Sequence, residues 1–288
     1  MASTQALKGR IRSVKSTKQI TKAMELVAAS KMRRAQEATK ASAPYTHAAR
    51  QLLTTLSTHT AVQEHPLFAH RPVENRLLIV IASDKGLAGA FNSNLNRLYA
   101  NELKQDIAND VKTSTITVGR RAAQFVSRLK NVTVLGSYQD LSDRPGSSEL
   151  HAILDTARDL FMGDEVDAVD IIYTDYISSV RQEATTMRIF PAGFKEEPEP
   201  NASKDVLYEP NIEEVLNSVV FRLIGAQLYQ ALLDSRASEH SMRMMAMKNA
   251  SDNAGDLIDD LTVEMNKARQ AAITQELAEI SGGTEALS

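Results

Sequence analysis

The strongest constraint on this chain is a proline-free stretch of about seventy residues, from Asn211 to about residue 280. Only Gly225 and Gly255 interrupt it, and Asn211 is a favourable helix N-cap. A helix of that length spans roughly 100 Å. An α/β domain of about 130 residues has a radius of gyration of only about 14 Å. The helix must therefore project beyond any domain that the rest of the chain forms.

Apolar and small side chains recur along this stretch at alternating steps of three and four residues. That spacing is a heptad seam, which buries its apolar side against a partner helix. The Met-rich run 241–250 fits both seam packing and an adaptable binding face. The predicted seam consists of Met244, Met247, Ser251, Ala254, Ile258, Leu261, Met265, Ala268 and Ala272.

The N-terminal region, residues 3 to about 58, predicts a second long helix. It has no glycine after Gly9, and its one proline, Pro44, would kink the helix rather than end it. We expect the two terminal helices to pair as a long antiparallel coiled coil, completed by a surrounding partner because its seam is rich in small residues. The predicted N-terminal stripe is Leu7, Ile11 and Val14, then Met24, Val27 and Ala28 after a shift of register.

The middle of the chain changes from a helical to a strand-like period. Strands are expected at 76–84, 113–120, 132–136 and 168–176, with an edge hairpin strand in 185–193; helices are expected at 91–107, 121–130 and 147–162. Alternating strands and helices predict an α/β fold with a Rossmann-like, mostly parallel βαβ sheet. The expected organisation is a coiled-coil helix at 1–58, an α/β domain at 76–193, and a coiled-coil helix at 206–288 that pairs with 1–58.

The charge distribution indicates an acidic neighbour for the N-terminal helix. Residues 1–40 contain ten Lys or Arg against Glu25 and Glu37, an excess of +8. Nucleic acid is disfavoured as the neighbour, because no aromatic residues are interleaved with these basic residues. The absence of cysteine excludes disulfides and thiol chemistry. With no apolar run near 18 residues and no secretory signal, we expect a cytosolic chain that reaches membranes through partners.

No motif predicts catalysis, a cofactor or a metal. The segment 83–92 follows a strand and precedes a helix, but it lacks the glycine spacing of a phosphate-binding loop, so it is interpreted as a tight turn or contact loop. Asp84 has no evident partner for acid–base chemistry. The group formed by His59, Glu64, His65 and His70 lacks the spacing of a helical metal-ligand pair.

Three stretches, 7–36, 81–92 and 265–283, closely resemble the gamma subunit of F-type ATP synthases. The segments 208–210 and 237–255 extend the resemblance over essentially the whole chain. The C-terminal signature is present as Ile273, Thr274, Glu276, Glu279 and Gly283. The chain departs from the family pattern at Gly282, often Ser, and at Thr284, usually Ala.

The resemblance implies a non-catalytic central stalk of a proton-transporting complex. Its coiled coil would lie inside a hexamer of alpha and beta subunits, with catalysis in beta. Its α/β domain and foot would rest on the c-ring beside epsilon, in a complex that also contains delta. The complex would attach to the cytoplasmic face of a bacterial cell membrane.

The resemblance also implies partner contacts for seven residues. Arg269 and Gln270 would contact a catch loop of a beta subunit, and Tyr208 and Glu209 would lie near the c-ring or epsilon. The residues expected near the collar of beta subunits are Met24, Lys22 and Lys31.

Two other functions stay open from the residues alone. One is a coiled-coil adaptor that tethers a small α/β module; the other is a nucleotide-dependent enzyme built on the α/β domain. Subunit stoichiometry separates the adaptor from the stalk, and ATP binding by the isolated chain would identify the enzyme.

Overall fold

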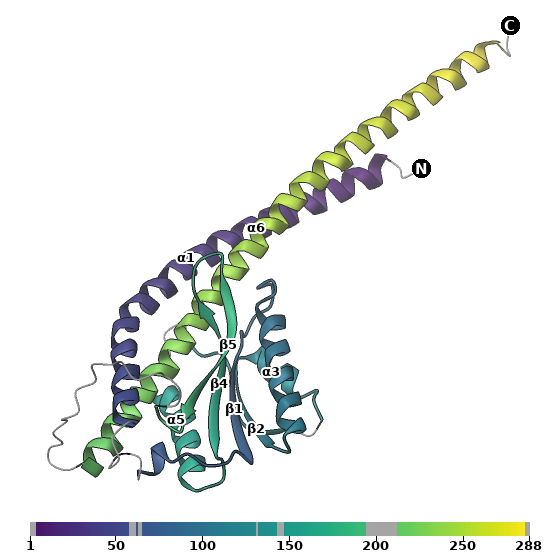
Figure 1. Cartoon of the computed structure of the whole chain (residues 1–288). Helices are drawn as coiled ribbons and strands as arrows, with labels where there is room; N and C mark the ends of the chain where they lie inside the picture. Colours follow the sequence, from purple (N-terminus) through teal and green to yellow (C-terminus); the bar gives the residue numbers. More distant parts are fainter. Residues whose placement is uncertain are drawn as a thin grey trace. The chain divides into compact units, whose positions relative to one another are not determined.

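The computed structural model describes residues 4–57, 62, 65–130, 132–142, 147–193 and 212–285 (Figure 1). Two very long helices begin and end the chain, with a five-stranded sheet between them in sequence. The elements are α1 (Thr4–Ser57), η1 (Pro66–Phe68), β1 (Asn75–Ile81), α3 (Phe91–Ala108), β2 (Lys112–Val118), α4 (Arg120–Val126), β3 (Thr133–Tyr138), α5 (Ser147–Met162), β4 (Ala168–Tyr176), β5 (Gln182–Phe190) and α6 (Ile212–Glu285).

The chain divides into two compact units, and each long helix contributes to both. The first unit, the coil unit, comprises Met1–Ala29 and Arg243–Ser288; the second, the α/β unit, comprises Ser30–Met242. The sequence predicts a different division, with domain boundaries at 58, 76, 193 and 206, and those boundaries stay a prediction. Both terminal helices are confirmed, and α1 continues through Pro44 without a break.

The coil unit is an antiparallel helix pair (Figure 1). Leu7 and Ile11 of α1 form an apolar cluster with Leu261 of α6. Further along α1, the Lys18 ammonium lies beside Gly255, so rising numbers on one helix meet falling numbers on the other. The partly buried side chains packed against this cluster are Val14, Ile258, Met265 and Ala268.

The predicted seam of α6 is correct in its centre and wrong at Ala272, and the predicted stripe of α1 is wrong at Val27. Along α6, Met247, Ser251, Ala254 and Leu261 are buried. Ala272 is exposed, because α1 begins at Thr4 and offers no helix to cover the end of α6. Val27 is also exposed, because Ala28 instead takes the inward position on α1.

The sheet has the strand order β3-β2-β1-β4-β5. The first four strands in that order are parallel, and β5 pairs antiparallel with β4, which confirms the mostly parallel sheet and the edge hairpin strand. Since β1 leads to β2 on one side and β4 lies on the other, the order reverses between β1 and β4.

Gly119 sets the boundary between β2 and α4. Its φ of +93° suits glycine, and a Cβ there would lie 2.1 Å from the Ala82 carbonyl oxygen. The strand therefore ends at Val118 and the helix begins at Arg120, one to two residues earlier than the patterns predict. The predicted helix 121–130 is also too long, since α4 ends at Val126.

Helices cover both faces of the sheet. One core packs α3 and α4 against β1, with Leu95, Tyr99 and Val126 buried on Leu78 and Val80. The larger core covers the other face with α5 and with the parts of α1 and α6 that belong to this unit. Its helical residues include Leu53, Leu56, Ile153, Phe161, Leu216, Ile224 and Leu228. The long helices are thus integral to the α/β unit.

A buried charge network fixes the edge strand β5. The Asp170 carboxylate on β4 accepts hydrogen bonds from Arg188 on β5, at 2.8 and 2.9 Å, and pairs with Arg76 on β1 at 2.5 Å. Arg76 also pairs with Asp106 and Glu102 of α3, at 3.0 and 2.8 Å. Three strands and a helix therefore share one network of two arginines and three carboxylates.

Asp234 is a second buried acid, on α6 where this helix covers the sheet. Its carboxylate accepts a hydrogen bond from Gln230 at 3.0 Å and is only 7% exposed. Burial and the nearby Asp175 carboxylate raise the pKa of Asp234 to about 7, against the opposing effects of Gln230 and Arg50. The folded chain therefore holds a proton here that the unfolded chain loses near pH 4.

Asp234→Asn should stabilise the chain above neutral pH. The stability contributed by protonated Asp234 is fully present below the ordinary pKa of 3.8 and is lost as pH rises through about 7. Asn keeps the acceptor for Gln230 and removes the charge. We expect a gain of up to about 4 kcal/mol at pH 8 and little change at pH 4. Denaturant unfolding of the full chain at both pH values measures it.

Asp256→Asn is the matched control, since Asp256 is an exposed acid on the same helix. It should shift the unfolding free energy by less than about 0.5 kcal/mol at either pH. An equal gain for both variants, or a gain independent of pH, would contradict a buried proton at Asp234.

Candidate partner-contact sites

Helix α6 crosses the carboxyl ends of the central strands. The Ser235 hydroxyl accepts the Thr174 backbone N–H at 3.1 Å, and the Ser238 hydroxyl donates to the Thr174 carbonyl at 3.3 Å. The Ser241 hydroxyl donates to the Ser179 carbonyl at 2.7 Å. Small hydroxyl side chains on one helical face thus satisfy the end of β4 and let α6 approach it closely.

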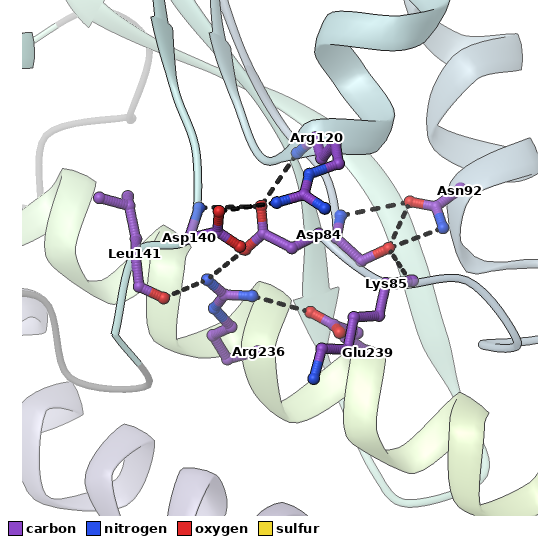
Figure 2. Close-up of polar contacts among 9 residues, drawn as sticks. Asp84, Lys85, Asn92, Arg120, Asp140, Leu141, Arg236 and Glu239 are labelled. Atoms are coloured by element: carbon purple, nitrogen blue, oxygen red, sulfur yellow. Dashed lines mark hydrogen bonds and ion pairs between the residues drawn. The ribbon is translucent and has the colours of Figure 1, made fainter.

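Arg236 extends this contact to the end of β1, as Figure 2 shows. Its guanidinium pairs with Asp84 at 3.4 Å, donates to the Leu141 carbonyl at 2.9 Å, and pairs with Glu239 at 3.1 Å. Arg236 and Asp84 side chains are each 12% exposed, and that of Glu239 is 6% exposed. We call this arrangement the Arg236 joint.

Asp84 holds the other side of the joint (Figure 2). Its carboxylate accepts the backbone N–H groups of Arg120, at the start of α4, and Asp140, at 3.0 and 3.1 Å. Burial raises the pKa of Asp84, but these two N–H donors and the Arg236 charge outweigh it, so the pKa lies below its ordinary value. The sequence offers no evident acid–base partner for Asp84, and the structure gives it structural partners from distant segments instead.

The joint lies where an α/β sheet of this order binds nucleotides. Ligands in such folds sit outside the carboxyl ends of the strands, at the point where the strand order reverses. Here that point lies between β1 and β4, and α6 contacts the residues that follow both strands. The segment 83–92 is a contact loop, tied internally by Ser83 and Asn92 at 2.8 Å. This geometry favours a structural use of the crevice.

The coil unit carries most of the predicted contact residues, at two separate levels. Arg269 and Gln270 are exposed just beyond Ala268, near the start of α1. Met24 is half-buried, and Lys22 is exposed and pairs with Glu25 at 3.0 Å. Leu7 and Lys22 are fifteen residues apart on α1, which corresponds to about 22 Å along the helix. The structure therefore does not bring the two sets together.

The other predicted contact residues lie elsewhere. Lys31 is exposed in the part of α1 that belongs to the α/β unit. Tyr208 and Glu209 lie outside the described residues. The roles of all seven residues stay predictions.

Apolar side chains also lie on the outside of the coil unit, which the heptad pattern does not explain. Beyond Ala268, α6 exposes Ile273, Leu277 and Ile280, at 50%, 60% and 65%. Their spacing of four and three residues places them on one helical face. On α1, Ile20 and Leu26 are 59% and 62% exposed. An apolar surface of this kind indicates a protein partner around the coil.

The described ranges contain no cluster of three or more His, Asp or Glu suited to a metal ion. His65 accepts the Leu67 backbone N–H through Nδ1 at 3.3 Å and so caps η1, whereas His59 and Glu64 lie outside the described residues. No helix within the same ranges combines the length and the apolar character that crossing a bilayer requires.

Sequence reasoning missed the Arg236 joint and the outer apolar residues. The joint unites segments near positions 84, 120, 140 and 236, and no local pattern predicts their meeting. The outer residues had a signal, since Ile273 and Leu277 fall out of phase with the seam.

Curated relatives match the chain from end to end. The ATP synthase gamma chain of Xylella fastidiosa (strain M23) is 41% identical over 288 residues and covers 100% of both chains. The ATP synthase gamma chain of Staphylococcus haemolyticus (strain JCSC1435) is 37% identical, with the same coverage.

Solved structures show the same fold. The central stalk and c-ring structure of the Tetrahymena thermophila mitochondrial ATP synthase contains a chain 27% identical to this one, with a TM-score of 0.62, covering 81% of this chain and 99% of that one. A chain of the Euglena gracilis enzyme, 17% identical, matches with a TM-score of 0.71 over 99% of this chain and 94% of that one. The family described as ATP synthase matches residues 3–287, and the chain belongs to that family, with the gamma chains as its relatives.

Proposed function

We propose that this chain is the central rotary shaft of an F-type ATP synthase, coupling proton flow through a c-ring to ATP synthesis in beta subunits. The observation that carries the proposal is the coil unit with apolar residues on its outside. Ile273, Leu277 and Ile280 lie on α6 beyond the residues that pack against α1, and nothing in the described part of the chain covers them. A collar of alpha and beta subunits supplies that cover.

The shaft acts through its asymmetry. One exposed helix end and two contact levels about 22 Å apart present a different surface to each catalytic site around the collar. A surface that binds one conformation of a site better than another shifts the population of that site. Rotation therefore moves each beta subunit through its conformations in turn.

Rotation reaches the coil through α6. This helix is unbroken from Ile212 to Glu285, so it joins the α/β unit to the coil unit without a loop. Within the α/β unit, the Arg236 joint and the serines at 235, 238 and 241 hold it to the sheet. A force applied to the α/β unit is thereby transmitted to the helix.

The chain itself contributes no catalytic group in this proposal. Helix α6 contacts the residues at the carboxyl ends of β1 and β4, where sheets of this order bind nucleotides. This contact supports a structural role for the sheet. Alpha and beta subunits surround the coil; epsilon, delta and the c-ring complete the set of partners. The complex holds the chain at the cytoplasmic face of a bacterial cell membrane, in keeping with the bacterial relatives.

Purification of the tagged chain from mildly solubilised membranes tests the proposal. We expect ATPase activity in the eluate and three alpha and three beta subunits per copy of this chain. A complex without ATPase activity and without a threefold excess of any subunit would support the adaptor function instead.

Arg269→Ala with Gln270→Ala should weaken coupling in the assembled complex. Both side chains are exposed, so the chain loses no buried contact and should fold normally. Loss of a charge-assisted hydrogen bond to a beta subunit is expected to slow ATP synthesis by about tenfold. ATP synthesis by membrane vesicles under an imposed proton gradient measures the effect.

The matched control changes the neighbouring exposed pair, Asn266→Ala with Lys267→Ala. It should leave the synthesis rate within about twofold. Equal rates for both double variants and the parent chain would show that Arg269 and Gln270 make no functional contact.

Arg236→Ala should loosen the attachment of α6 to the sheet. It leaves Asp84 and Glu239 without their shared cation, which should cost about 3 kcal/mol of unfolding free energy in denaturant titrations of the full chain. In the assembled complex, we expect fewer protons pumped per ATP hydrolysed. Arg181→Ala removes an exposed pair with Glu183 and is the control. Unchanged stability and pumping for Arg236→Ala would remove the joint from the mechanism.

A further inference from the structure

A hollow of about 630 Å³ opens at the amino edge of the sheet, away from the Arg236 joint. It lies between α3, the start of β2, and the segment that leads from α4 into β3. Its apolar lining includes Leu103, Leu129 and Val132, all half-buried. Ile107 stands at its side with 76% of its surface exposed.

Three cations surround this apolar lining. Lys104, Lys112 and Lys130 all line the hollow and all are exposed. Within the described part of the chain, none of the three forms an ion pair. Glu165 is the one acidic residue of the lining, so the hollow carries a net charge of +2, three minus one.

The combination of an apolar hollow with flexible ammonium groups indicates an anionic lipid surface. Lys side chains near a membrane attract acidic headgroups, and exposed apolar residues enter the boundary between headgroups and acyl chains. A protein partner fits less well, since interfaces between proteins are depleted in Lys and favour Arg, and no Arg lines this hollow.

We propose that the hollow at the amino edge of the sheet binds the anionic headgroups of the membrane surface, with Lys104, Lys112 and Lys130 as the headgroup ligands and Ile107 as the apolar contact. The inference rests on the proposed function, in which the complex holds the chain at the cytoplasmic face of a membrane. It adds to that function a direct lipid contact made by this chain.

A single-cysteine probe tests the proposal, because the chain contains no cysteine. Ile107→Cys in the full chain carries an environment-sensitive fluorophore, and phosphatidylcholine vesicles with or without phosphatidylglycerol are added. We expect a blue shift only with phosphatidylglycerol. The control probe replaces Leu87, 63% exposed in the loop that follows the carboxyl end of β1, and should not respond.

Replacing the three lysines by Gln should abolish the response. Each Lys near an anionic surface contributes about fivefold to binding, so the triple variant should bind roughly a hundredfold more weakly at the Ile107 probe. The matched control replaces Lys8, Lys15 and Lys40, exposed lysines of α1, and should leave the blue shift at the probe in place. All six are surface positions, and unchanged unfolding midpoints confirm intact folding.

Three outcomes would overturn the inference: a blue shift with phosphatidylcholine alone, an equal shift at position 87, or a full response in the triple variant. A response to an acidic, apolar peptide with none to vesicles would assign the hollow to a protein partner instead. Since vesicle binding needs no other subunit, its failure leaves the stoichiometry test of the shaft unaffected.

Discussion

The contact between Arg236 and Asp84 determines how the longest helix of this chain relates to its sheet. Helix α6 continues from Ile212 to Glu285, and the part before Arg243 belongs to the α/β unit, where specific contacts hold it. Apolar residues of this part of α6 pack in the larger core, and a buried guanidinium that contacts two carboxylates and the Leu141 carbonyl adds directional contacts that specify the register. The serines at 235, 238 and 241 reinforce that register through the β4 backbone.

This attachment also lies where an α/β sheet of this strand order binds nucleotides. The reversal between β1 and β4 creates a crevice in every such sheet. In this chain the residues after those strands, Asp84 and Ser179, contact α6 through Arg236 and Ser241. The same backbone geometry that elsewhere binds phosphate therefore binds a helix, and the fold by itself does not specify which.

The elements were largely predictable from sequence, because their signals are local. Periodicity located both terminal helices, and the strand 168–176 matches β4 residue for residue. The errors arose where tertiary structure decides. Val27 faces outward because its neighbour Ala28 packs inward, and α4 begins early because Gly119 turns against Ala82. The contact level of Arg269 and Gln270 came from resemblance, whereas the joint depends on four distant segments.

The α/β unit contains two buried acids, Asp170 and Asp234, whose surroundings differ in charge. Asp170 is paired with two arginines, Arg76 of β1 and Arg188 of β5, which ties the edge strand to the sheet. Asp234 lies near another carboxylate, Asp175. Its pKa of about 7 means that the protonated and ionised forms of Asp234 are both populated near neutral pH. It lies two residues before Arg236, on the segment that holds α6 to the sheet. The α/β unit therefore combines a paired acid on its strands with a buried acid of raised pKa on α6.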